Sequence, residues 1–311
     1  MADDRIPVVD LTDFTSGDAA KRAAFVKTLG EGLEMFGFVS VIGHGVDPAL
    51  LERAYGLARK TFGQPVEVKR QYETPENGRQ RGYTSFGVEH AKDHPAADLK
   101  EFWHVGRVLP DDHPLTVSRD VPPNQLPAEV PEFGETFVAL FYALEDFSWR
   151  LLDAIGEYLG KPPSFFRDMV QDGNSVLRVI NYPDLGGPVP VGAIRAAQHE
   201  DINLMTVLPA STQPGLELMT REGKWLAVQT PPDVMVCDTG DMMQLLTAGR
   251  LPATTHRVVN PEGGSDGGRL SMPFFLHPHP DYVIRPMREG YGEPAVTRDF
   301  LMKRLREIGV A

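Results

Sequence analysis

The sequence predicts a mainly β protein with flanking helices, whose core is a double-stranded β-helix of the jelly-roll, cupin-like type and whose N-terminal region is helical. From Ser175 onward, short runs rich in β-branched and aromatic residues alternate with turns that contain Gly or Pro, as in antiparallel double-sheet jelly rolls. Before residue 172, apolar residues recur mainly at helical spacing. The chain has 311 residues, which suits one large domain or a core with a helical extension.

The first 120 residues are predicted to form a mixed α/β region. Its β-rich runs alternate with amphipathic stretches, which indicates strands separated by helices. The second β-rich run ends in Gly43-His44-Gly45, where we expect His44 to be a turn residue. Strands are expected at residues 6–11, 37–42 and 100–105, and helices at residues 18–36, 49–62 and 66–72.

A polar segment, residues 73–95, has few periodic apolar residues and contains Arg81-Gly82-Tyr83. Long irregular loops in compact domains often carry function. The strand expected after it would place Lys100, Phe102 and His104 on one face, because alternate side chains of a strand point the same way.

Residues 121–172 are predicted to supply supporting helices. After a proline-rich connection, residues 133–159 form the longest expected helix, and a shorter helix is expected at residues 163–169. The long helix carries an apolar stripe, which indicates core packing against the outside of the barrel. The stripe consists of Phe137, Leu140, Phe141, Leu144, Phe147, Leu151 and Leu152.

Residues 173–285 are predicted to form the jelly-roll domain, and residues 286–311 a C-terminal helical segment. The helical pattern of that last segment covers residues 297–308. Strands of the jelly roll are expected at residues 176–182, 203–208, 216–219, 225–228, 234–237, 255–259 and 270–276.

Composition predicts a soluble, cytoplasmic protein without nucleic-acid or membrane partners. The net charge is −12, which argues against a nucleic-acid groove or an anionic membrane surface. One cysteine excludes an intramolecular disulfide and suits a reducing compartment. The acidic N-terminal residues lead into no apolar run, so we expect no signal peptide.

Two histidines and an aspartate form the strongest candidate site. If residues 199–201 lie in a strand, His199 and Asp201 share a face and Glu200 points away. With the distant His256, they would occupy one face of a divalent metal and leave the other face open, as in the facial triad of non-haem iron(II) oxygenases. Thirteen residues later, Arg269 and Ser271 would also share a face, and a guanidinium fork beside a hydroxyl suits a carboxylate.

This order of motifs resembles the signature of the isopenicillin-N-synthase-like 2-oxoglutarate- and iron(II)-dependent dioxygenases. The flanking residues 235–242 and 246–250 resemble the family's segment before the second histidine, although the family often has Asn where Asp238 stands. The resemblance extends from residue 6 to about residue 280. It implies iron(II) held by His199, Asp201 and His256, with 2-oxoglutarate as cosubstrate and molecular oxygen as oxidant.

The resemblance also assigns a cosubstrate site and a reaction. It implies that Arg269 and Ser271 anchor the distal carboxylate of 2-oxoglutarate, and that Tyr182, in a Tyr-Pro pair, hydrogen-bonds the cosubstrate. The implied reaction couples decarboxylation of 2-oxoglutarate to succinate and CO2 with oxidation of a small-molecule substrate. Hydroxylation is the expected oxidation, and desaturation or ring closure are open alternatives.

Substrate contacts are expected from residues 73–105, from the strand after Ser271 and from the C-terminal helix; in the family, the region of the strand 100–105 forms part of the substrate cavity. Arg195 would share the strand face of Asp201, where the small Ala197 leaves room. It could therefore reach a substrate anion at the cavity mouth; a solvated arginine at a strand start is the alternative. The candidate substrate residues are Arg195, Arg81, Tyr83, Phe102 and Phe274.

Two other functions stay open on the sequence alone. One is an iron(II)-dependent oxidase of the same fold that does not use 2-oxoglutarate, which the absence of succinate would identify. The other is a non-catalytic metal- or ligand-binding protein, which iron-dependent oxygen consumption would exclude. A further His277-Pro278-His279 pair lacks a nearby third ligand, so we expect it to lie in an exposed loop.

Overall fold

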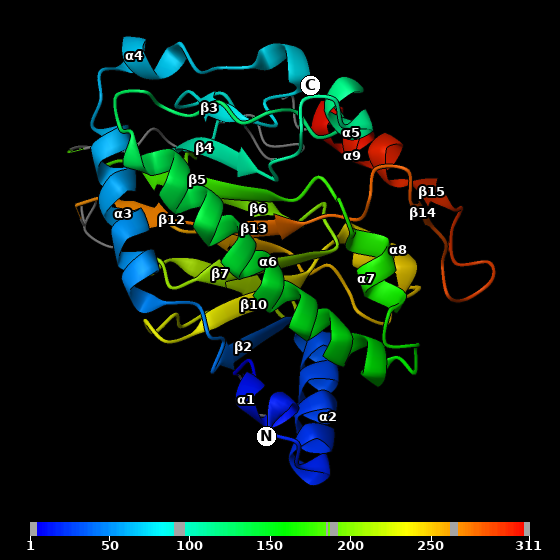
Figure 1. Cartoon of the computed structure of the whole chain (residues 1–311). Coiled ribbons are helices and arrows are strands. Elements are labelled where there is room, and N and C mark those ends of the chain that lie inside the picture. Colours follow the sequence, from blue (N-terminus) through cyan, green and yellow to red (C-terminus); the bar gives the residue numbers. More distant parts are fainter. Residues whose placement is uncertain (1–4, 90–96, 185, 187–191, 262–266, 308–311) are drawn as a thin grey trace.

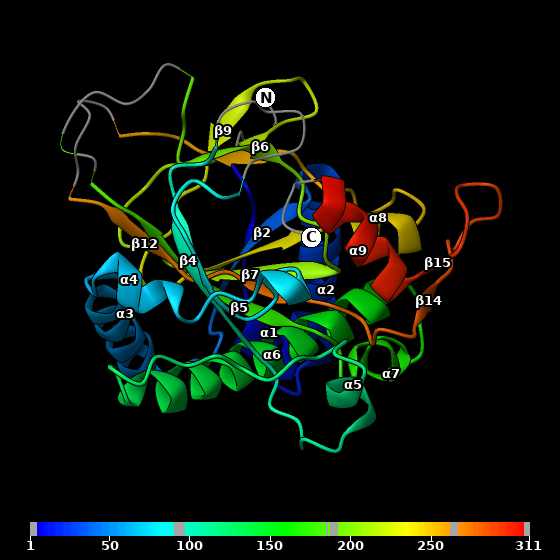
Figure 2. The same ribbon diagram turned by 90° about the horizontal axis from the view of Figure 1, so that it is seen from above.

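The computed structural model describes residues 5–89, 97–184, 186, 192–261 and 267–307. Within these residues the strands form a large sheet, a four-stranded sheet and a short two-stranded pair. The two larger sheets face each other, and helices cover the outer face of the large sheet (Figure 1, Figure 2). This arrangement confirms the predicted mainly β fold with a jelly-roll core and flanking helices.

The large sheet joins strands from both halves of the chain. Its order is β1-β2-β10-β7-β13-β5-β4-β3, and β12 also pairs with β5. The N-terminal region therefore extends the jelly-roll sheet, while the predicted boundaries at residues 120, 172 and 285 stay a prediction. The strands are β1 (Val8–Asp10), β2 (Phe38–Ile42), β3 (Gly82–Thr84), β4 (Glu101–Gly106), β5 (Val176–Tyr182), β7 (Met205–Pro209), β10 (Met235–Thr239), β12 (Arg269–Ser271) and β13 (Phe274–Leu276).

The four-stranded sheet has the order β6-β11-β8-β9, so β6 is an edge strand of that sheet. Its inner face meets the large sheet through an apolar cluster that includes Phe38 and Val236 from the large sheet and Leu218 and Val258 from the smaller one. The strands are β6 (Ala196–His199), β8 (Leu216–Met219), β9 (Trp225–Ala227) and β11 (His256–Val258), with β14 (Val283–Ile284) and β15 (Ala295–Val296) forming the separate pair.

The helices bury the other face of the large sheet. The apolar stripe of α6 is fully buried, as predicted, and Phe141 packs edge-on against Phe274 of β13 at 5.1 Å between ring centroids. No helix in the described part of the chain is both long and apolar enough to cross a membrane. The helices are α1 (Leu11–Thr15), α2 (Ala19–Phe36), α3 (Pro48–Phe62), α4 (Val66–Arg70), α5 (Pro114–Val117), α6 (Glu132–Tyr158), α7 (Phe165–Val170), α8 (Asp241–Leu246) and α9 (Thr297–Glu307), with a 3-10 turn at Pro75–Asn77.

Three expectations about local structure were wrong in detail. The expected strand 270–276 is two strands, because Pro273 has no N–H to donate and its carbonyl accepts from Arg178 N instead. The irregular segment 73–95 contains β3, whose backbone pairs with β4. The helix α8 begins directly after β10, where the sequence predicted no helix.

Candidate active site

The register of two strands brings the two histidines together. In the pairing of β11 with β6, His256 lies opposite His199, and their ring centroids are 4.4 Å apart. Asp201 was expected to continue the strand, but β6 ends at His199. The chain turns there because the carbonyl oxygen of Asp201 accepts from Asp241 N at the start of α8 (2.7 Å). The aspartate side chain nevertheless faces both imidazoles.

Three ligand atoms converge in this arrangement. The Oδ1 atom of Asp201 lies 3.8 Å from Nε2 of His199 and 3.7 Å from Nε2 of His256. One ligand atom from each of the three residues lies within 4.8 Å of the others. Two imidazole nitrogens and one carboxylate oxygen are a donor set that suits divalent iron.

Hydrogen bonds at the far side of each ligand fix its orientation. Nδ1 of His199 lies 2.7 Å from the Ala197 carbonyl oxygen, and Nδ1 of His256 lies 3.1 Å from the Thr254 carbonyl oxygen. A carbonyl oxygen can only accept, so each Nδ1 carries the proton and each Nε2 keeps its lone pair for a metal. The Thr206 hydroxyl donates to Oδ2 of Asp201, which leaves Oδ1 facing the histidines.

The electrostatic environment also suits a metal. Burial and the neighbouring His256 lower the pKa of His199 to about 4, so its imidazole is neutral near pH 7, and the neutral form is the one that binds metals. Asp238 of β10 is buried nearby, and desolvation together with the Asp201 charge raises its pKa well above the usual range. A protonated Asp238 is uncharged, like the Asn that the family often has there.

Apart from the metal ligands, a group of polar side chains surrounds Arg269. Its partner in the β12–β5 register is Tyr182, and the guanidinium carbon lies 5.2 Å from the Tyr182 ring centroid. Nε donates to the Gln213 carbonyl oxygen (2.9 Å) and Nη2 to the Ser211 hydroxyl (2.7 Å). The Ser211 hydroxyl also lies 3.2 Å from the Ser271 hydroxyl. The sequence did not point to Ser211 or Gln213, because neither belongs to the Arg-x-Ser motif.

This site fits a carboxylate. Arg269 is 2 % exposed, and among the described residues its Nη1 has no hydrogen-bond partner. The titratable neighbours that influence Arg269 among the described residues are Tyr182, Tyr55 and Arg195, not a carboxylate, and burial lowers its pKa. A buried cation with a free N–H is costly unless an anion pairs with it. Arg269 and Ser271 thus offer a charge and a hydroxyl to an anionic ligand.

Two family models of known proteins match this chain. Residues 6–129 match the family model of the non-haem dioxygenase in morphine synthesis N-terminal domain, and residues 173–278 match that of the 2OG-Fe(II) oxygenase superfamily. The chain belongs to the 2OG-Fe(II) oxygenase superfamily. It is an oxidoreductase that uses iron(II) and 2-oxoglutarate, as the sequence predicted.

Individual relatives of this oxygenase cover nearly the whole chain. Flavanone 3-dioxygenase 2 of Oryza sativa subsp. japonica is 30 % identical over 305 residues, which are 96 % of this chain and 82 % of the rice protein. A Caulobacter crescentus crystal structure described as of the 2OG-Fe(II) oxygenase family is 38 % identical, with a TM-score of 0.85 over 97 % of this chain and 98 % of that one. A full-length Neurospora crassa protein crystallised in complex with alpha-KG is 25 % identical, with a TM-score of 0.85 over 98 % of this chain and 97 % of the Neurospora chain.

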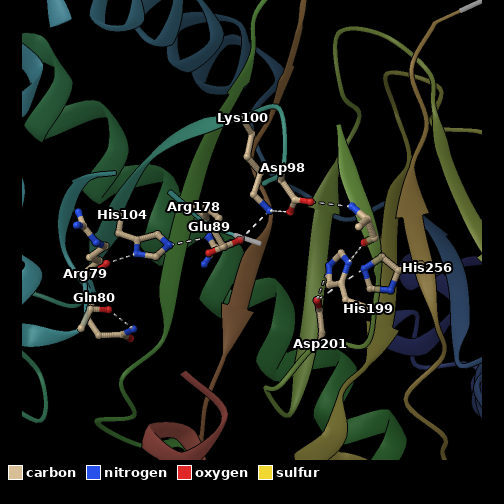
Figure 3. A network of polar contacts seen from close by, with 12 residues as sticks. Arg79, Gln80, Glu89, Asp98, Lys100, His104, Arg178, His199, Asp201 and His256 are labelled. Carbon is tan, nitrogen blue, oxygen red and sulfur yellow. Dashed lines mark hydrogen bonds and ion pairs between the residues drawn. The ribbon is translucent and has the colours of Figure 1, made fainter. Parts of the chain in front are cut away.

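The oxygenase has a cavity of about 470 Å³ beside the proposed metal ligands. His199 and Asp201 form part of its wall, and residues of α9 such as Leu301 and Leu305 form another part. A polar wall comes from β4, β5 and the segments before them (Figure 3). It contains Gln80, Glu89, Asp98, Lys100, His104 and Arg178. Lys100 and His104 thus share a face of the β4 segment, as the alternation predicted.

None of the five predicted substrate residues is among the described residues that line this cavity, and their roles stay predictions. Arg81, Tyr83, Phe102 and Phe274 are all buried, and the described residues that line the cavity do not include them. Arg81 instead donates to Asn174 Oδ1 at 2.9 Å. Arg195 lies near the proposed cosubstrate site, with its guanidinium carbon 6.0 Å from the Tyr182 ring centroid.

His277 also lines the cavity, although the sequence placed it in an exposed loop. It is 6 % exposed, and its Nδ1 lies 3.2 Å from the Phe275 carbonyl oxygen. His277 does lie in a loop, directly after β13, but the expected exposure was wrong, because the residue is buried at the cavity wall. This burial lowers its pKa to about 4.

We expect His277 to make the metal-free protein less stable as the pH falls from about 6.5 toward 4. Above this window the imidazole is neutral in both states, whereas within it only the unfolded chain takes up the proton. At about pH 5, this difference in proton binding lowers the free energy of unfolding by about 2 kcal/mol relative to neutral pH. Urea unfolding at pH 7 and pH 5 should therefore show a smaller loss of stability in His277→Asn than in the wild type. Equal losses would contradict this assignment.

Proposed function

We propose that this oxygenase hydroxylates a small, uncharged organic molecule bound in the cavity beside His199 and Asp201. The observation that carries the proposal is the adjacency of the converging ligand atoms and a cavity of about 470 Å³. That volume suits a small organic ligand. Relatives that are 30 % identical are named for small molecules, as flavanone 3-dioxygenase 2 of rice and gibberellin 20 oxidase 1-A of Triticum aestivum.

In this proposal the chain contributes ligands and orientation. His199, Asp201 and His256 hold the iron, and the backbone carbonyls and the Thr206 hydroxyl behind them keep their donor atoms aligned. Iron(II), when bound, supplies the activation of oxygen and the removal of hydrogen from the substrate. The expected stoichiometry transfers one oxygen atom to succinate and the other to the product.

Arg269 and Ser271 hold the distal carboxylate of 2-oxoglutarate in the proposal. The free Nη1 of Arg269 and the Ser271 hydroxyl supply the donors, and Tyr182 lies beside the guanidinium. Because Arg269 is already fixed by Gln213 and Ser211, little side-chain freedom is lost when the anion binds. The oxidase and non-catalytic alternatives are not favoured, since the family uses 2-oxoglutarate and the ligand set is intact.

The charge of the cavity supports an uncharged substrate. Among the described residues, six acidic side chains line it against three basic ones. The two cations of the polar wall, the buried Lys100 and the partly buried Arg178, are already paired with carboxylates. A substrate carboxylate would enter a site with an excess of negative charge, which costs free energy. The acidic residues are Glu89, Asp98, Glu200, Asp201, Asp241 and Glu307, and the basic ones Lys100, Arg178 and Arg304.

A stimulation assay tests this proposal. The protein, with iron(II), 2-oxoglutarate and oxygen, is given matched pairs of compounds, each a carboxylic acid and its primary amide, and succinate and hydroxylated product are quantified. We expect amides to stimulate succinate formation more than their acids, with product and succinate in equal amounts. Stimulation by acids alone would contradict the uncharged substrate, and succinate without any oxidised product from a stimulating compound would contradict hydroxylation.

A further inference from the structure

The backbone of Ala197 lies between the cavity wall and a proposed metal ligand. Ala197 is in β6, the edge strand of the four-stranded sheet, and the pairing of β6 with β11 aligns Ala196 and His199 rather than Ala197. An N–H on the open edge of a strand normally faces water. Ala197 is 1 % exposed, so its N–H needs an acceptor inside the protein.

Asp98 supplies that acceptor from a distant part of the chain. Its Oδ1 accepts from Ala197 N at 3.0 Å, and the next residue, Leu99, donates from its backbone N to the Ile194 carbonyl oxygen at 3.1 Å. The segment before β4 therefore lies along the open edge of β6. Figure 3 shows Asp98 between Lys100 and the β6 backbone, close to the two histidines.

The same residue of β6 also orients His199. Ala197 lies where the β6–β11 register shifts, and both of its backbone polar groups bond to side chains outside that strand pairing. The N–H is held by Asp98, and the carbonyl oxygen accepts from Nδ1 of His199 at 2.7 Å. We propose that Asp98 is a positioning residue of the metal centre, which acts on His199 through the backbone of Ala197.

The Asp98 carboxylate is itself held by the polar wall of the cavity. Lys100 Nζ lies 2.8 Å from Asp98 Oδ2 and 2.7 Å from Glu89 Oε1, and Glu89 also accepts from Arg178 Nη1 at 3.0 Å. Arg178 Nε donates to His104 Nε2 at 2.7 Å. One hydrogen-bonded network therefore connects the polar wall, where we expect the substrate, with the backbone that orients His199.

The competing explanation is that Asp98 serves only as a counter-ion for the buried Lys100. The two roles differ in what Asp98→Asn should do. An asparagine side chain keeps an oxygen that can accept from Ala197 N but loses the charge. If Asp98 positions His199, Asp98→Asn should retain the metal affinity that Asp98→Ala loses. If Asp98 is only a counter-ion, both substitutions should lower the metal affinity equally.

Metal affinity is the measurement that separates these roles. This inference rests on the proposed role of His199 as a metal ligand, so His199→Ala is included as a reference. Metal-free wild type, Asp98→Ala, Asp98→Asn, Glu101→Gln and His199→Ala are titrated with Co(II) and followed by its visible absorption, after circular dichroism has established that each is folded. Glu101 is a matched control, because its buried carboxylate pairs with Lys69 and Asn181, away from His199.

We expect Asp98→Ala to weaken Co(II) binding about 10- to 100-fold, as loss of an outer partner of a metal-ligating histidine does. The Co(II) affinities of Asp98→Asn and Glu101→Gln should both stay within about threefold of the wild-type affinity. Equal weakening in Asp98→Ala and Asp98→Asn, equal weakening in Asp98→Ala and Glu101→Gln, or no weakening in Asp98→Ala would each overturn the proposal. If Asp98→Ala does not fold, an Asp98→Asn protein that binds as weakly as His199→Ala overturns it. Wild-type affinity in His199→Ala would instead refute the proposed metal ligands.

Discussion

Replacement of His256 by Ala should abolish iron-dependent succinate formation and weaken Co(II) binding by more than about 100-fold. Loss of an outer hydrogen-bond partner of a ligand already costs about 10- to 100-fold in metal affinity, so loss of the ligand itself should cost more. His256 lies directly opposite His199 in the β11–β6 pair, and neither neighbouring strand residue can supply a substitute imidazole. The measurements are metal titration and succinate quantification.

His279→Ala is the matched control for this substitution. It removes an imidazole of the same size from outside the ligand group, where His279 Nδ1 accepts from Asp281 N. The control should retain wild-type metal affinity and succinate formation. If His256→Ala behaves like His279→Ala, the ligand set is wrong.

Arg269→Ala should raise the apparent Kd for 2-oxoglutarate by about 100-fold or more, while Co(II) affinity stays near the wild-type value. Removing one partner of a buried ion pair typically costs about 3 to 5 kcal/mol, and each 1.4 kcal/mol is about a tenfold change. Arg269→Lys keeps the charge but not the planar fork, so we expect an intermediate loss. Titration of the metal-loaded protein with 2-oxoglutarate measures both effects.

Arg257→Lys is the appropriate control for Arg269→Lys. Arg257 lies on β11 and pairs with Glu217 at 2.7 Å in a partly exposed position away from Ser271. It should leave the Kd for 2-oxoglutarate unchanged. If Arg269→Ala binds 2-oxoglutarate like the wild type, the anion site lies elsewhere, and a parallel loss of Co(II) affinity would indicate a general disturbance of the barrel.

The Arg-x-Ser pair was predictable because strand geometry determines which of its side chains share a face. Side chains two residues apart share a face, and this alternation brought Arg269 and Ser271 to one site. The sequence could not reveal which strands pair, although the pairing explains why His256 meets His199 and why Tyr182 meets Arg269. Asp201 reached the correct position by a turn rather than by the expected strand.

The cavity was harder to predict, because its wall is assembled from separate segments. Arg81 and Tyr83 were chosen from a polar segment, but both are buried, Tyr83 in β3, which pairs with β4, and Arg81 directly before it. Asp98 and Glu89 became informative only once their ion pairs with Lys100 were known, and Arg178 once its ion pair with Glu89 was known. Similarly, the sequence did not reveal that the loop after β13 buries His277 at the cavity.

Isotope labelling of succinate tests the central claim most directly. Wild-type protein is reconstituted without oxygen with iron(II) and 2-oxoglutarate, exposed to ¹⁸O₂, and the succinate is analysed by mass spectrometry. We predict succinate that carries one ¹⁸O atom, at a yield that depends on iron and falls to background in His256→Ala. Iron-loaded protein that consumes oxygen without forming labelled succinate would contradict the account.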